Sequence, residues 1–270
     1  MIVTVANQKG GVGKTTTVVN MAAALAEAGR SVLVVDLDPQ GNATTGMGVS
    51  SRSDNAGVYD VLIDDVPLVE TVVHVPENPS LRLVPASLDL AGAEIELVSM
   101  VAREYRLRKA LRSYLEGADV DVVLIDCPPS LGLLTLNALV AGEELLIPIQ
   151  CEYYALEGLG QLIRTVEMVK EHLNPQLTIG SILLTMTDNR TNLSEQVADE
   201  VRAFFGELVY TTEIPRSVRL SEAPGHGRSG VSYDPRSAGA QAYQEAAREF
   251  SERIIDLTEA SAPALEQVKS

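Results

Sequence analysis

Several residue types that mark secreted, metal-binding or membrane-inserted proteins are scarce in this sequence. Two cysteines, three histidines and no tryptophan occur in 270 residues. Cys127 and Cys151 lack the C-x-x-C spacing of zinc and redox sites and follow apolar runs, so we expect two small buried side chains and no disulfide framework. The histidines lie far apart without metal-ligand spacing, and we assign them no role.

Long apolar runs and a positive net charge are absent as well. No run approaches the ~20 apolar residues that a membrane-spanning helix needs. The chain enters an apolar stretch without a signal peptide, so we expect a cytoplasmic protein. The formal net charge of −16 argues against a protein that coats nucleic acid with its whole surface, although residues 103–112 form a locally basic stretch.

A glycine-rich loop follows the first apolar stretch and opens directly into a helical pattern. Residues 8–17 read QKGGVGKTTT. Glycines let backbone N–H groups close around phosphate oxygens, and the N-terminus of the next helix adds a fixed positive potential. Lys14 would reach the β- and γ-phosphates, and the Thr15 hydroxyl would bind Mg²⁺. The predicted nucleotide-binding residues of this loop are Gly10, Gly11, Val12, Gly13, Lys14, Thr15 and Thr16.

Short apolar runs alternate with helical patterns along the rest of the chain. The predicted strands span residues 2–6, 31–36, 120–126, 144–150, 177–186 and 208–214, with 81–85 and 69–75 as further candidates. The predicted helices lie near 15–29, 89–98, 103–116, 132–141, 155–173, 193–205 and 237–256. Continuous apolar runs indicate strands buried on both faces, hence a parallel sheet. We predict an α/β, single-domain, doubly wound P-loop NTPase over residues 1–256, with helices on both faces of a mostly parallel sheet, and a flexible tail over 257–270.

Two predicted strands end in carboxylates. Asp126 lies at the carboxyl tip of its strand, where open α/β sheets bind ligands, and this Walker B arrangement predicts contact with Mg²⁺. Asp36 and Asp38 lie two residues apart, on the same side of an extended chain. Asp36 fits an outer partner of the metal, and Asp38 is placed to align the attacking water. The alternative is that these aspartates cap turns, since Asp-Pro-Gln-Gly is a good turn sequence.

These segments together resemble one family. The loop has Gln8 where the general P-loop pattern has glycine, and it adds Lys9, as in the deviant Walker A loop of the ParA/MinD group of ATPases. A glycine-rich turn with two solvated lysines is the alternative, which the flanking strand and helix disfavour. The segments KGGVGKTT at 9–16, DLDPQGN at 36–42 and DCPPS at 126–130 resemble the ParA family of DNA-partition ATPases, and those at 150–158 and 214–224 strengthen the match. The likeness runs from about residue 1 to about 253 and is greatest to the small chromosomal members called Soj.

The resemblance implies an ATPase that uses ATP and Mg²⁺. Lys9 matches the signature lysine, which reaches the phosphates of the neighbouring subunit, and Asp38 matches the catalytic aspartate. The nucleobase is expected near Met186 and the turn at Pro215 and Arg216.

Family members form an ATP-dependent sandwich dimer and then bind double-stranded DNA without sequence preference. They hydrolyse ATP slowly until a ParB-type centromere-binding protein stimulates them. Arg190 and Arg219 match the family's DNA-binding positions, so a nucleoid-associated homodimer is implied.

Three alternatives stay open at this stage. A membrane-cycling ATPase like MinD ends in a basic amphipathic helix, whereas the last predicted helix here carries little positive charge, so we expect no membrane partner. An electron-transfer ATPase like the nitrogenase iron protein needs cysteines across a dimer axis, and Cys127 lies instead inside the Walker B segment. A nucleotide-gated scaffold that positions a protein cluster differs from a partition ATPase only in its cargo, which a neighbouring gene for a ParB-like protein would identify.

Overall fold

A central sheet organises the computed structural model, which describes residues 1–50, 56–152, 159–188 and 190–266, with side chains to residue 253. Within these ranges the sheet has eight strands in the order β3-β4-β2-β5-β1-β6-β7-β8. Neighbouring strands pair in parallel, except that β3 pairs antiparallel with β4 at one edge. The strands are β1 Ile2–Val5, β2 Val32–Asp36, β3 Val73–His74, β4 Leu81–Val84, β5 Val122–Asp126, β6 Glu144–Gln150, β7 Thr178–Thr187 and β8 Ile214–Pro215.

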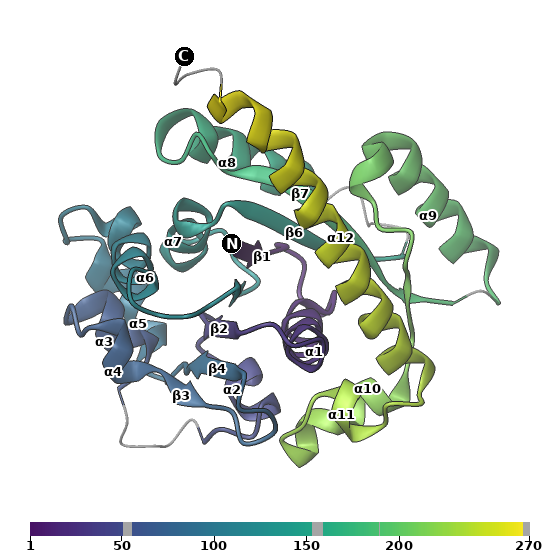
Figure 1. The fold of residues 1–270 in the computed structure, drawn as a ribbon, viewed down its shortest axis with the longest axis horizontal. Helices are drawn as coiled ribbons and strands as arrows, with labels where there is room; N and C mark the ends of the chain where they lie inside the picture. Colours follow the sequence, from purple (N-terminus) through teal and green to yellow (C-terminus); the bar gives the residue numbers. More distant parts are fainter. Residues whose placement is uncertain (51–55, 153–158, 189, 267–270) are drawn as a thin grey trace.

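Helices cover both faces of this sheet (Figure 1). One face packs against α3 Val58–Ile63, α4 Leu68–Thr71, α5 Leu90–Leu97, α6 Arg106–Leu115, α7 Leu133–Ala141, α8 Leu159–His172 and α9 Asn192–Phe205. The other packs against α1 Lys14–Glu27, α2 Asn42–Gly46, α10 Val218–Glu222, α11 Gly230–Tyr233 and α12 Ala238–Glu266. The predicted doubly wound α/β fold is therefore confirmed.

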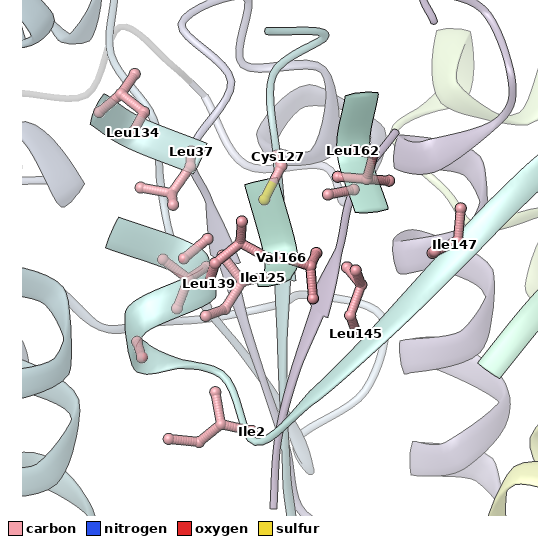
Figure 2. Packing of buried hydrophobic residues seen from close by; sticks show 14 of the residues in the cluster. Ile2, Leu37, Ile125, Cys127, Leu134, Leu139, Leu145, Ile147, Leu162 and Val166 are labelled. Atoms are coloured by element: carbon pink, nitrogen blue, oxygen red, sulfur yellow. The ribbon is translucent and has the colours of Figure 1, made fainter. Parts of the chain in front are cut away.

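The central strands β1, β2 and β5 are largely apolar because they are buried on both sides. In β5, Val123 and Ile125 join the core beneath α7, whereas Val122 and Leu124 join the core beneath α1. Figure 2 shows the first of these cores, with Ile125 and Cys127 among leucines from α7 and α8. Both cysteines are buried, as predicted. The carboxyl ends of β1, β2 and β5 consequently meet at one edge of the sheet, directly beside the glycine-rich loop.

The predicted strand 208–214 is wrong for most of its length. Val209 makes only an isolated bridge to Ile182, and the regular strand is confined to Ile214–Pro215. The N–H groups of Thr211 and Thr212 donate to the Glu249 carboxylate at 2.8 and 3.0 Å. A side chain of α12 thus takes the donors that a strand ladder would have used.

The candidate strand 69–75 is also wrong in its first half, because Pro67 precedes the short helix α4 and the regular strand is confined to Val73–His74. The short helices α2, α3, α10 and α11 were not predicted. The first residues of the predicted helix 155–173 lie outside the described residues, and α8 begins at Leu159. Helix α12 continues to Glu266, past the boundary predicted at residue 256. The flexibility of the tail stays a prediction.

No helix in the described part of the chain combines the length and the apolar character needed to cross a membrane.

Candidate nucleotide-binding site

The glycine-rich loop has the backbone shape that holds an anion. Gly11 and Gly13 have φ angles of 77° and 89°, a left-handed conformation that other residues rarely adopt. Gly13 precedes α1, and its carbonyl accepts the N–H of Thr17 at 2.8 Å. The first turn of α1 contains no acidic residue, so its N–H groups face the loop with uncompensated positive potential.

A cavity of 570 Å³ opens above this loop. Its lining comes from the loop and α1, from the segment after β2, from β7 and from the α10–α11 region. The lining residues are Gly10, Gly11, Gly13, Lys14, Thr15, Thr16, Val19, Asn20, Asp38, Gln40, Asn42, Thr45, Gly46, Pro129, Met186, Leu220, Pro224, Arg228 and Gly230. The volume and the convergent polar groups suit a ligand of nucleotide size.

Lys14 is held inside the site. Its side-chain ammonium donates to the Lys9 carbonyl at 3.2 Å, and the residue is only 7% exposed. Burial lowers the pKa of this ammonium, while the negative charges of Asp126 and Asp38 oppose that shift. A bound phosphate would supply the close anionic partner that Lys14 lacks among the described residues.

Two aspartates lie side by side beneath the cavity and are partnered differently. Asp36 and Asp126 are paired in register on β2 and β5, and both are completely buried. The Asp36 carboxylate accepts the N–H and hydroxyl of Thr44 at 2.8 and 2.7 Å and the N–H of Asp38 at 3.2 Å. Burial raises the pKa of Asp36 to about 6 despite these hydrogen bonds. Asp36 therefore anchors α2 to the sheet, and its predicted role as a metal partner stays a prediction.

In contrast to Asp36, Asp126 has no hydrogen-bond partner for either carboxylate oxygen among the described residues. Burial, with the neighbouring Asp36 charge, raises the pKa of Asp126 well above its ordinary value, and the nearby Thr15 hydroxyl opposes this shift only in part. A buried, unsatisfied carboxylate next to a phosphate loop is a group that a divalent cation would stabilise, so the donor set fits Mg²⁺.

Asp38 both closes a turn and lines the cavity. Its carboxylate accepts the N–H of Gln40 at 3.0 Å, and its carbonyl accepts the N–H of Gly41 at 2.9 Å. The side chain is part of the cavity wall and 7% exposed. The turn interpretation and the catalytic interpretation of the sequence are thus compatible.

Lys9 lies outside the cavity lining. Its ammonium forms an ion pair with Glu152 at 3.2 Å, and the Arg216 guanidinium lies 3.9 Å from the same carboxylate. Glu152 therefore holds the extra lysine away from the nucleotide site of its own chain.

The predicted nucleobase residues are only partly brought together. Met186 lines the cavity and has a φ of 53°, unusual for a non-glycine residue. Val12, predicted as part of the phosphate loop, is buried, and its carbonyl accepts the Thr185 hydroxyl. Pro215 ends β8 and Arg216 follows it; both lie outside the cavity lining, and their contact with a base stays a prediction.

Sequence reasoning missed the wall contributed by the C-terminal region. Asn20 on α1 donates to the Thr16 carbonyl and accepts the N–H of Val231, 211 positions away. Arg228 lines the cavity and donates to the Ser232 carbonyl at 2.8 Å. The single polar Asn20 within an otherwise apolar stretch of α1 was a usable signal, whereas nothing near Arg228 in the sequence marks its place.

The two predicted DNA-binding arginines are exposed and already paired. Arg190 forms two hydrogen bonds of 2.8 Å to Asp188, with its side chain 86% exposed. Arg219 contacts Glu222 at 2.9 Å and Asp234 at 3.4 Å. Their role with DNA stays a prediction.

Comparison with known proteins gives a consistent set of relatives. Residues 1–179 match a protein family described as an AAA domain. The sporulation initiation inhibitor protein Soj of Bacillus subtilis is 53% identical over 250 residues, which cover 93% of this chain and 98% of the relative. The chromosome partitioning protein ParA of Myxococcus xanthus is 51% identical, covering 93% and 88% of the two chains.

Solved structures agree on the fold. A protein from Mycobacterium smegmatis described as cobyrinic acid a,c-diamide synthase, with bound ADP and magnesium, is 44% identical with a TM-score of 0.79, covering 92% of each chain. The septum site-determining protein MinD of Pyrococcus horikoshii, complexed with Mg-ADP, is 28% identical with a TM-score of 0.74, covering 92% of this chain and 95% of that one.

Proposed function

The chain belongs to the Soj/ParA family of chromosome-partitioning ATPases, and from this premise we propose how its geometry serves DNA segregation. ATP with Mg²⁺ binds in the 570 Å³ cavity and brings two copies of the chain together as a sandwich dimer. The dimer binds double-stranded DNA without sequence preference on the nucleoid, in the cytoplasm. Hydrolysis, stimulated by a ParB-type centromere-binding protein, releases the DNA.

The unsatisfied Asp126 carboxylate carries the nucleotide part of this proposal. It lies at the end of β5, buried and without a partner among the described residues, beside the phosphate loop. Asp126 and the Thr15 hydroxyl would hold Mg²⁺, while Lys14 and the loop N–H groups would hold the phosphates. Bound Mg²⁺ neutralises charge on the phosphates. Asp38, in the cavity wall, would orient the attacking water.

The position of Lys9 supports a dimer. The side chain lies outside the cavity of its own chain and is held by a partly exposed Glu152. A lysine so placed is available to a nucleotide bound by a second copy. Because a nucleotide enclosed between two subunits favours the dimer over the separate chains, ATP concentration then controls assembly.

Dimerisation would also strengthen DNA binding by a protein whose net charge is −16. Arg190 and Arg219 are each neutralised by a neighbouring carboxylate, so one chain offers few unpaired positive charges to DNA there. Affinity for DNA rises steeply with the number of phosphate contacts, and a dimer presents every such contact twice. DNA binding should therefore depend on ATP and weaken strongly with salt.

One competing activity has less support. A MinD-like membrane cycle needs a basic amphipathic helix. The described side chains of α12 include Arg248 and Arg253, and both pair with glutamates of the same helix.

Binding to duplex DNA of arbitrary sequence tests the proposal directly. The protein is incubated with no nucleotide, ADP or ATP and Mg²⁺ across a salt series, and with anionic liposomes in parallel. Binding that requires ATP and falls steeply with salt supports partition. ATP-dependent binding to liposomes with no DNA binding in any nucleotide state would instead point to a membrane cycle.

A further inference from the structure

Helix α6 has two sharply different sides. Leu107 and Leu111 are completely buried in the apolar core. Arg108, Lys109 and Arg112 lie on the outer side, which gives the helix its strongly amphipathic character. Among the described residues neither Arg108 nor Arg112 has an ion-pair partner, and Lys109, 76% exposed at its side chain, meets Asp65 at 3.3 Å. The outer side of α6 thus offers positive charge that the protein does not itself neutralise.

This charge contrasts with the rest of the molecule. Residues 103–116 contain five basic and two acidic residues, whereas the whole chain contains 21 basic and 37 acidic residues. The field of an acidic protein repels acidic partners everywhere except near such a basic region, which therefore directs them to one place.

A cavity of 650 Å³ lies beside the helix, larger than the nucleotide cavity. It runs between α6 and the segment from α3 to α4. Val66, Leu68 and Val69 supply much of its apolar wall, and Val69 is 66% exposed. Residues 117–119, which also line it, lead into the start of β5, so the cavity is at the opposite edge of the sheet from the phosphate loop.

The basic residues inside this cavity are already fixed by the protein. Arg106 pairs with Asp65 at 3.0 Å and donates to the Leu62 and Ile63 carbonyls. Arg82 donates to the Tyr114 hydroxyl, to Ser31 and to the Asp119 carbonyl. These side chains shape a rigid wall, so a ligand would meet a preformed site. The unpaired charges left for a ligand are those of Arg108 and Arg112, which lie on α6 outside this cavity.

We propose that α6 and this cavity form a docking surface for an acidic, amphipathic segment of a partner protein. An apolar side chain of the segment enters the cavity against Val66 and Val69, and its carboxylates pair with Arg108, Lys109 and Arg112. This α6 surface is separate from the nucleotide cavity and from the arginines assigned to DNA, since α6 lies far from α9 and α10 in Figure 1. It is a second place of contact, independent of the proposed partition cycle.

The chemistry of the α6 surface favours a protein segment over nucleic acid. The apolar part of the cavity wall, at Val66, Leu68 and Val69, adds nothing to phosphate binding, whereas it accommodates a leucine or phenylalanine side chain. A helix with acidic residues flanking one apolar anchor satisfies both features.

Peptide selection on the full-length protein tests this proposal. A display library of random peptides, about 16 residues or four helical turns long, is selected against the wild-type chain. We expect enrichment of peptides that combine Asp or Glu with a large apolar residue. The resynthesised peptides are then measured by fluorescence anisotropy against the variants R108E/R112E and Val69→Asp.

Both variants change surface positions, and their melting temperatures verify that they fold. We expect each to bind the peptides at least about tenfold more weakly than wild type, with weakening by salt. Arg248→Glu, which changes an exposed arginine (66%) on α12, is the control and should bind like wild type. Three results would overturn the proposal: no acidic amphipathic peptides among the binders, equal binding by R108E/R112E, or loss of DNA binding in R108E/R112E as large as in Arg190→Glu.

Discussion

Two charged regions of the molecule are organised in opposite ways. At the carboxyl ends of the strands, Lys14 and Asp126 are buried and, among the described residues, incompletely partnered. At the surface, Arg190 and Arg219 are exposed and fully paired with carboxylates. A buried charge without a partner raises the free energy of the empty protein, which a complementary ligand then recovers. An exposed, paired charge contributes little alone, and many are needed together.

The comparison predicts that changes at the buried region act on catalysis and ligand binding in large steps. Asp38→Ala should lower the ATP hydrolysis rate by about 100-fold or more, because a group that orients water contributes on the order of 10²–10⁴ to a rate. Nucleotide affinity should hardly change, and the DNA-bound state should persist. Steady-state hydrolysis and DNA retention after ATP dilution measure the two effects. ATP hydrolysis at the wild-type rate in Asp38→Ala would show that Asp38 is not a catalytic residue.

Lys14→Ala should weaken ATP binding by roughly 100-fold, since a buried, charge-assisted contact contributes about 1.5–3 kcal/mol. Calorimetric titration with ATP and Mg²⁺ measures this. Lys9→Ala is the informative control, because Lys9 lies outside the cavity and should leave the affinity of the single chain unchanged while impairing dimerisation. Equal losses of ATP affinity in Lys14→Ala and Lys9→Ala would contradict the different roles proposed for these two lysines.

Asp126→Asn should have two effects of opposite sign. Because burial and Asp36 raise the pKa of Asp126 in the folded protein, the wild type loses stability as the pH rises from the ordinary carboxyl pKa to the raised one. The variant should therefore melt a few degrees higher than wild type without nucleotide, with a gain that grows across this pH range, about 2–4 °C for each kcal/mol. It should lose most of the stabilisation that Mg²⁺ with ATP confers. Thermal melts with and without Mg²⁺-ATP measure both effects, and a lower melting temperature without ligand would refute the interpretation.

The smallest single effects are expected at the exposed region. Arg190→Ala and Arg219→Ala should each weaken DNA binding a few-fold in the ATP state and reduce the slope of affinity against salt, by about one for each phosphate that the arginine no longer binds. Nucleotide binding and hydrolysis without DNA should match wild type. Arg248→Ala provides an arginine of comparable exposure with no assigned role in DNA binding. A drop in ATP affinity would place these arginines in the nucleotide site instead.

Local patterns made the phosphate loop and the six main strands predictable. The loop needs glycines at fixed positions, and the strands need apolar residues on both faces. The features that could not be predicted depend on contacts between residues that are far apart in the sequence. The residues around Thr211 and Thr212 have the composition of a strand, and nothing near them shows that Glu249 of α12 binds their N–H groups. The cavity beside α6 likewise arises between segments that are distant in the sequence, and it has no local signal.

The hydrogen bond between Asn20 and Val231 has a consequence for the folding of the nascent chain. The phosphate loop leaves the ribosome first, yet part of its cavity wall lies around Arg228. The back of α1 is covered by α11 and α12, where Val231 binds Asn20 and Tyr243 meets the Thr17 hydroxyl at 3.1 Å. A nascent chain therefore carries an uncovered apolar helix, and an unfinished nucleotide site, until these C-terminal helices have been synthesised.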